Sequence, residues 1–306
     1  MTSRARNLLA LVAVLILLAC ALPTLPSSPT PTSLPAPTFT SPAMATATAC
    51  PTPSPTSTAR PTPASAEVTD IITFTVVYDN HVYDRALGTA WGFACLIEQP
   101  DATILFDTGG KGDLLLDNMA ALGKEPAAID LVVLSHAHGD HTGGLEALLS
   151  EVSPTVVLPT AFPASIKRWV RRRTEVTEVE EARTLLPGVL VTEPVSGPPV
   201  EQALAVQTAE GWIVVTGCAH PGVERMTQAA KDAGAGDVAL VLGGFHLGSA
   251  SDRRIHSTID ALQALGVRAV APLHCTGKRA RRLFADAYRG DCRLAGVGAT
   301  FTFEAP

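Results

Sequence analysis

Three histidines and an aspartate lie within six residues, in the segment His136-Ala-His138-Gly-Asp140-His141. In an extended turn, His136 and His138 point the same way because side chains two residues apart share a face. Asp140 and His141 then face a second point nearby. Imidazole and carboxylate groups bind divalent metals. The spacing therefore predicts two metal ions that share a bridging hydroxide, which is a centre for hydrolysis.

A buried strand must deliver this segment. The run from Leu131 to Ser135 is apolar until its last residue, which is typical of a strand covered on both faces. Other polar groups also follow predicted strands, so the strand ends are expected to gather them at one edge. These groups are Asp107 at the end of 103–107, Cys218 and His220 after 212–217, His246 after 238–243, and His274 after 268–271.

The alternation of strands and helices predicts an α/β domain in which two sheets are covered by helices. The remaining expected strands are 71–78, 90–97, 155–158, 203–207 and 299–303, and the expected helices are 114–122, 145–149, 164–173, 223–233, 254–265 and 279–288.

The His136–His141 segment resembles the first metal motif of the metallo-β-lactamase superfamily, and the resemblance extends over about residues 70 to 303. It implies a four-layer αββα sandwich. The earlier Asp107-Thr-Gly109 resembles another superfamily motif, whose aspartate orients the metal-binding segment by hydrogen bonding and does not itself bind metal, a second-shell role. Within the superfamily, the chain is similar to the branch named for dihydropterin ribofuranosyl-aminobenzene phosphate synthase. That closer likeness lies in residues 216–222, 243–247 and 273–277.

The chain departs from the common superfamily pattern in two ways. It has no histidine between Thr142 and Ala219, and Cys218 stands where an aspartate would bridge the metals. The resemblance therefore implies that His220 supplies the missing imidazole and that His274 is the last ligand. His246 is either a further ligand or a group that donates a proton to substrate. Cys218 is either a thiolate ligand or a neutral thiol in the second shell. The predicted ligands are His136, His138, Asp140, His141, His220 and His274, and the predicted catalytic groups are Asp140 and His246.

Residues 1–66 have a different composition from the rest. Arg4 and Arg6 precede an apolar run from Leu8 to Leu22, which suits a signal peptide. The end of that run, Leu17-Leu-Ala-Cys20, resembles the lipobox of bacterial lipoproteins, in which Cys20 is lipidated. An ordinary secretory signal is the alternative. Residues 21–66 contain 30 Pro, Ser or Thr residues, which predicts an extended tether without a core. The expected domains are 1–20, 21–66 and 67–306.

Residues 67–306 carry 20 basic and 29 acidic side chains. This acidic balance argues against a nucleic-acid partner and leaves a small-molecule substrate. The predicted protein is a metal-dependent hydrolase of an ester, lactone or phosphodiester, held outside the cytoplasm by a lipid anchor. Zinc suits the histidine-rich site, and iron or manganese remain alternatives. The competing functions are a pterin-related synthase and a non-catalytic metal-binding sensor.

Overall fold

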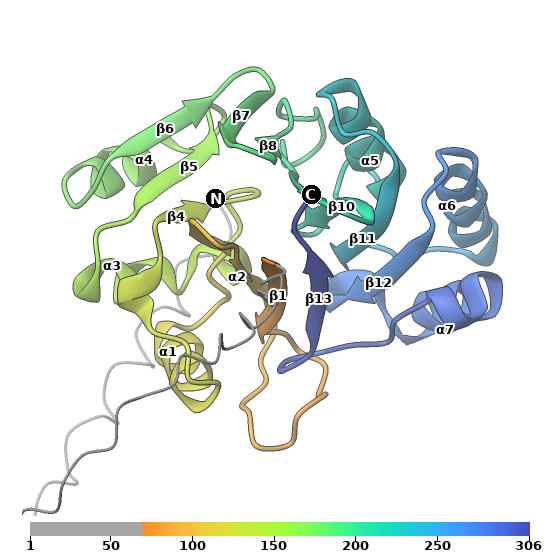
Figure 1. Cartoon of the computed structure of the whole chain (residues 1–306), viewed down its shortest axis with the longest axis horizontal. Coiled ribbons are helices and arrows are strands. Elements are labelled where there is room, and N and C mark those ends of the chain that lie inside the picture. Colours follow the sequence, from red (N-terminus) through yellow and green to blue (C-terminus); the bar gives the residue numbers. More distant parts are fainter. Residues whose placement is uncertain (1–69) are drawn as a thin grey trace, which may run out of the picture. The chain divides into compact units, whose positions relative to one another are not determined.

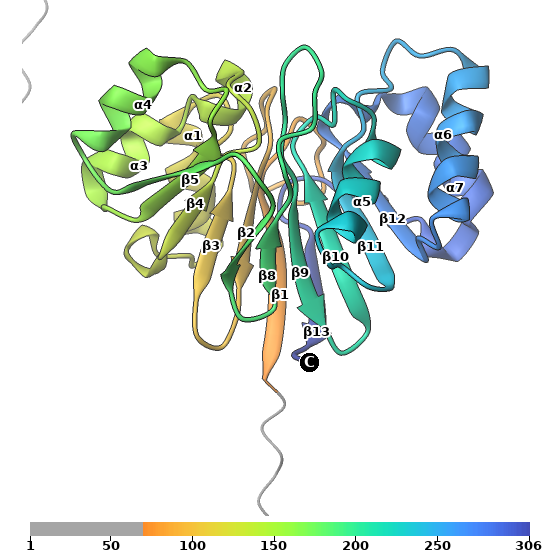
Figure 2. The ribbon, with the colours of Figure 1, turned by 90° about the horizontal axis from the view of Figure 1, so that it is seen from above.

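The computed structural model describes residues 70–306, which form a sandwich of two sheets. The predicted leader, tether and Cys20 lie outside these residues. Two layers of helices enclose the sheets (Figures 1 and 2), so the predicted αββα architecture is confirmed. Within residues 70–306, no helix has the length and apolarity needed to cross a membrane.

The first sheet has seven strands, and its central strands are buried because helices cover one face and the second sheet covers the other. β1 pairs antiparallel with its two neighbours, and the four strands at the other end of the sheet run parallel. The strand order is β13 (Thr300–Glu304), β1 (Ile71–Tyr78), β2 (Ala94–Glu98), β3 (Thr103–Phe106), β4 (Leu131–Val133), β5 (Thr155–Pro159) and β6 (Val176–Val179).

The second sheet has six strands, of which the first three in the order are parallel. That order is β12 (Ala269–Leu273), β11 (Val238–Gly244), β10 (Gly211–Thr216), β9 (Leu204–Thr208), β8 (Val189–Val191) and β7 (Arg183–Leu186).

The helices pack in two groups, one on the outer face of each sheet. Apolar side chains of both sheets, such as Phe74 and Leu242, form the central core between them. The first sheet carries α1 (Gly112–Ala121), α3 (Leu145–Glu151) and α4 (Ala164–Arg171), and the second carries α5 (Val223–Asp232), α6 (Asp252–Ala264) and α7 (Lys278–Tyr288). The short elements are α2 (Gly139–Thr142), η1 (Pro126–Ala128), η2 (His274–Thr276) and η3 (Arg289–Asp291).

Two strand predictions need correction. The strand expected from residue 90 begins only at Ala94, because the preceding backbone turns and packs against residues 136–141, here called the metal loop. Gly92 has φ +140°, and a Cβ there would lie 2.5 Å from the Asp140 carbonyl oxygen. The strand expected to reach Ser135 ends at Val133. Three further strands, β6, β7 and β8, were not predicted.

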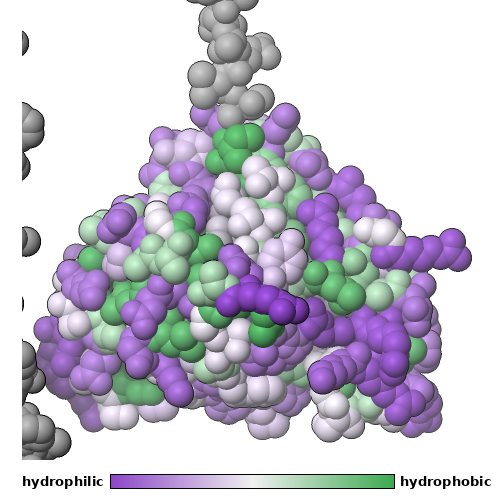
Figure 3. Space-filling model, turned by 90° about the horizontal axis from the view of Figure 1, so that it is seen from below, coloured by the Kyte–Doolittle hydropathy of each residue, from purple (hydrophilic) through white to green (hydrophobic). Residues whose placement is uncertain are grey.

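The outer surface is mixed in character. On the face in Figure 3, hydrophobic areas are broken up by hydrophilic side chains. The exposed large hydrophobic side chains within the described domain are Ile71, Val82, Tyr83, Trp91 and Leu294.

Candidate metal centre

Six strands of the two sheets place polar side chains together at one edge of the sandwich. The carboxyl ends of parallel strands meet at the same edge, which is where α/β proteins bind ligands. The groups that follow the strands are Asp79 and Asn80 after β1, Asp107 after β3, His136 after β4, Cys218 and His220 after β10, His246 after β11, and His274 after β12.

The backbone is left-handed at several of these strand ends. Asp107, Ala219, His246 and His274 all have φ between +45° and +57°. Such angles are uncommon outside glycine and cost energy, so they persist only where the surroundings impose them. The chain therefore turns sharply after these strands, and the turns direct the polar side chains toward the shared edge of the sandwich.

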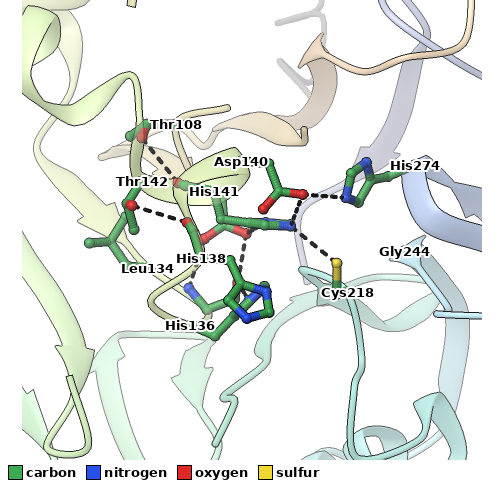
Figure 4. A network of polar contacts seen from close by, with 12 residues as sticks. Thr108, Leu134, His136, His138, Asp140, His141, Thr142, Cys218, Gly244 and His274 are labelled. Atoms are coloured by element: carbon green, nitrogen blue, oxygen red, sulfur yellow. Dashed lines mark hydrogen bonds and ion pairs between the residues drawn. The ribbon is translucent and has the colours of Figure 1, made fainter. Parts of the chain in front are cut away.

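The metal loop, residues 136–141, leaves β4 and enters the short helix α2. His136 and His141 are buried, whereas His138 is exposed. The loop is pinned through its backbone: Thr108 Oγ1 donates to the His141 carbonyl oxygen at 3.0 Å, and Thr142 Oγ1 donates to that of His138 at 3.0 Å (Figure 4). These hydrogen bonds fix the backbone of the loop and therefore the positions from which its side chains extend.

All six residues predicted as ligands come together in two sets. In each set, one potential ligand atom per residue lies within 4.8 Å of every other. Set A contains Asp140, His141, Cys218 and His274, and set B contains His136, His138 and His220. In each set the ligand atoms lie close enough together to hold a metal ion.

Cys218, for which the sequence left both a thiolate ligand and a neutral thiol open, lies inside set A. Its Sγ is 3.2 Å from His141 Nε2 (Figure 4). It also forms a third group, with His220 and His246, so Cys218 and His220 link set A to set B. The hydrogen bond with Cys275 and burial raise the pKa of Cys218. A thiolate at this position therefore needs an adjacent cation.

The ring nitrogens on the outer side of the ligands are held by hydrogen bonds. Asp107 Oδ2 accepts from His141 Nδ1 at 2.7 Å and so holds the outer side of this ring. Asn80 Oδ1 lies 2.9 Å from His274 Nδ1, and Ser135 Oγ lies 2.9 Å from His136 Nδ1. Such partners fix which ring nitrogen faces the metal.

The inward-facing nitrogens fit a metal. His136 Nε2 and His220 Nε2 are buried and have no hydrogen-bond partner, which is costly unless a ligand fills the space. Burial lowers the pKa of His136 and lowers that of His220 to about 4. Both imidazoles are therefore neutral at pH 7, which is the form that binds metal ions.

Three buried carboxylates surround the centre, and sequence reasoning found only Asp107 of the three. In residues 70–306, the ion-pair partners of Asp79, Asp107 and Glu201 are histidines, not lysines or arginines. Burial raises the pKa of Asp79 and of Glu201 to about 7. Arg281 also lowers the pKa of Asp79, but within the described part of the chain none of the three carboxylates forms an ion pair with a lysine or arginine. Buried carboxylates of this kind are expected where metal cations supply the countercharge.

Asp140 is only partly covered, and its Oδ2 is 3.3 Å from His274 Nε2. Burial raises its pKa, but the close contact with His274 and the charge of His141 outweigh burial and lower it overall. The carboxylate is thus ionised, as a metal ligand must be.

His246 and Trp91 border the cluster. His246 is exposed, and its ring centroid is 4.0 Å from that of His220, so it lies beside set B with one side open to solvent. Trp91, which is 59 % exposed, lies with its ring centroid 4.7 Å from that of His274. Both positions suit contact with a substrate.

Comparison with known proteins places these features in a family. Residues 92–256 match the model of the metallo-β-lactamase superfamily. The chain is 30 % identical over 288 positions to the 7,8-dihydropterin-6-methyl-4-(β-D-ribofuranosyl)-aminobenzene-5′-phosphate synthase of Methanocaldococcus jannaschii, and the match covers 78 % of this chain and 98 % of the relative.

Solved structures agree in fold. Tm1679, a metal-dependent hydrolase of the β-lactamase superfamily, superposes with a TM-score of 0.66 at 26 % identity, covering 75 % of this chain and 98 % of its own. The metallo-β-lactamase fold protein YhfI from Bacillus subtilis superposes with a TM-score of 0.58 at 15 % identity, and the match covers 76 % of this chain and 99 % of YhfI. The αββα sandwich, the His136–His141 segment at its edge and these matches show that the chain belongs to the metallo-β-lactamase superfamily.

Proposed function

We propose that the protein is a metal-dependent hydrolase. The observation that carries the proposal is the convergence of seven potential ligands in sets A and B, with buried imidazole nitrogens that lack any partner. Set A would hold one divalent ion and set B another. Zinc suits this mixture of imidazole, carboxylate and thiolate best, and iron or manganese are the alternatives. When bound, such ions lower the pKa of water and polarise a carbonyl or phosphoryl oxygen.

The side chains have distinct roles in this proposal. Asp140 Oδ2 accepts the proton released as water adds to the substrate, because it is ionised and partly open to solvent. His246 donates a hydrogen bond or proton to the leaving group from its exposed ring. Asp107 and Asn80 hold the rings of His141 and His274 so that their Nε2 atoms face inward.

Substitution of His138 by alanine tests the metal assignment. Set B then loses one of its three ligands, so the content of the purified full-length protein should fall from two metal ions per chain towards one. Metal analysis measures this, and hydrolysis of an ester, a lactone and a phosphodiester should fall in parallel. His256→Ala, on an exposed face of α6, is the matched control and should change neither. A metal-free wild-type protein, or unchanged activity in His138→Ala, would contradict the proposal.

The similarity to the Methanocaldococcus jannaschii enzyme favours a second candidate, a pterin-related synthase. Incubation of the metal-loaded protein with a dihydropterin that carries a leaving group on its 6-methyl carbon, and with a ribofuranosyl-aminobenzene phosphate that displaces this group, distinguishes the two functions. Formation of a joined product without hydrolysis in the substrate panel would favour the synthase. A metal-replete protein that turns over neither set of substrates would instead be a binding or sensor protein.

We also propose that Cys20 is lipidated and anchors the domain outside the cytoplasm. Arg4, Arg6, the apolar run and the lipobox-like ending support this proposal. Substitution of Cys20 by alanine should move the protein out of the membrane fraction of an expressing bacterium, because acyl chains supply the membrane affinity. Immunoblotting of the fractions measures the change, and Cys50→Ala is the matched control. Because an uncleaved apolar run from Leu8 to Leu22 can itself hold the variant in membranes, labelling with palmitate decides the matter: equal labelling of the wild type and the Cys20 variant would exclude a lipid anchor at this residue.

A further inference from the structure

Glu201 and Gln202 lie just before β9, and both side chains are fully buried. We propose that they are positioning residues that hold the metal loop of the first sheet and the 218–220 turn of the second sheet at the separation that both ligand sets require. The proposal rests on the proposed metal centre and extends it to residues outside the ligand sets.

Glu201 binds the turn that carries Cys218 and His220. Its Oε1 accepts hydrogen bonds from the backbone N–H groups of Cys218 and Ala219, each at 2.8 Å, and its Oε2 accepts one from that of His220 at 2.9 Å. Three consecutive N–H groups therefore point at one carboxylate. This arrangement holds Ala219 at its unfavourable φ of +57°.

Gln202 binds the other half of the centre. Its Nε2 donates to the carbonyl oxygen of Leu134 at 2.8 Å, and its backbone N–H donates to that of Ser135 at 3.0 Å. These two residues lead directly into His136. The adjacent residues Glu201 and Gln202 thus form hydrogen bonds with the 218–220 turn and with the residues that precede the metal loop.

The segment itself has little freedom. Glu201 and Val195 exchange backbone hydrogen bonds, at 2.8 Å for Val195 N and 3.2 Å for Glu201 N. The next residue, Ala203, donates its N–H to Thr192 Oγ1 at 3.0 Å. Because the backbone of residues 201–203 is fixed by these hydrogen bonds, the side chains of Glu201 and Gln202 can hold the turn and the metal loop at a constant separation.

Both ligand sets draw on both halves of the centre. Set A combines Asp140 and His141 of the loop with Cys218 of the turn, and set B combines His136 and His138 with His220. Movement of the turn relative to the loop would therefore weaken both sets together. A packing role alone would affect stability without this joint effect on the metal ligands.

Glu201→Gln tests the proposal because it preserves size and burial. An amide has one acceptor oxygen, so its NH2 group must face a backbone N–H that Glu201 now satisfies. We expect affinity for Co²⁺ to fall about 10- to 100-fold, the usual effect of losing an outer-shell partner. The thiolate-to-cobalt absorption band from Cys218 should weaken as well. Gln202→Met, which removes the donor to Leu134 from the other side, should also lower Co²⁺ affinity.

The measurement is a titration of metal-free, full-length protein with Co²⁺, followed by absorption, with Cys218→Ala defining the zero of the thiolate band. Thermal unfolding of the metal-free variants reports stability separately. Glu178→Gln, the same chemical change in a surface ion pair with Lys167, is the control. Reduced Co²⁺ affinity and band intensity in both folded variants would support the proposal. Wild-type affinity and band intensity in either folded variant would overturn it while leaving the metal centre intact. If the wild type binds no metal, the proposed function fails as well.

Discussion

Replacement of Asp140 by asparagine is expected to lower kcat/KM for hydrolysis by about 10²- to 10⁴-fold, the range that positioned acid–base groups contribute. The carboxylate lies within 3.3 Å of His274 Nε2 and 3.8 Å of His141 Nε2, inside set A. The amide has nearly the same shape, but it neither carries the negative charge nor accepts a proton readily. Steady-state kinetics on whichever substrate the panel identifies provides the measurement.

Metal analysis of the Asp140 variant separates its two roles. If the variant keeps two ions and still loses activity, proton acceptance accounts for the loss. If it keeps one ion, ligation accounts for it. Asp260→Asn, on the exposed face of α6, is the matched control and should behave as the wild type. Activity within twofold of the wild type in Asp140→Asn would exclude both roles.

Replacement of Asp107 by alanine should have the largest effect on stability, about 3–5 kcal/mol in the free energy of unfolding, because it breaks a buried charged network. Asp107 accepts from Ser135 N, Ser135 Oγ and His141 Nδ1, each at 2.7 Å. Alanine leaves the Ser135 N–H and the His141 Nδ1 buried without this acceptor, and Ser135 Oγ keeps only its contact with His136 Nδ1. It also places an ordinary residue at φ +57°, which costs further energy. Urea unfolding of the metal-free protein measures the change.

Asp107→Asn is the informative comparison for that loss. Asparagine tolerates left-handed backbone and retains one acceptor oxygen, so it should recover part of the stability lost in the alanine variant. It should not restore the charge that orients His141, and metal affinity should stay low. Equal stability of the alanine variant and the wild type would show that this hydrogen-bond network contributes little to folding.

The central strands and the metal loop were predictable because their signals are local. An apolar run such as Leu131–Leu134 indicates a buried strand without further information. Three histidines within six residues likewise indicate a cluster of metal ligands. The edge strands β6 and β7 carry no such signal, and β8, which lies between β7 and β9, is an apolar run of only three residues. Val176–Val179, for example, is a short stretch with a glutamate, beside a basic helix. Pairing with neighbours, not composition, makes it a strand.

The supporting residues were harder to predict for the same reason. Glu201 follows Pro198-Pro199-Val200 in a segment without periodicity, and Asn80 follows a strand as many surface asparagines do. Their roles depend on contacts with residues 17 and 194 positions away along the chain. The position of Cys218 was visible in the sequence, but its distance from His141 depends on how the two sheets pack.

The pairing of the first and last strands has a practical consequence for handling the protein. Ile71 at the start of β1 lies opposite Glu304 at the end of β13, and Figure 2 shows this edge far from α2. The eight residues of β1 span roughly 26 Å at about 3.3 Å per residue, and its other end leads to Asn80 beside His274. A support or fusion partner joined at either residue 70 or residue 306 would therefore lie at the end of the sandwich opposite sets A and B. A short linker between these two ends is a natural starting point for circular permutation.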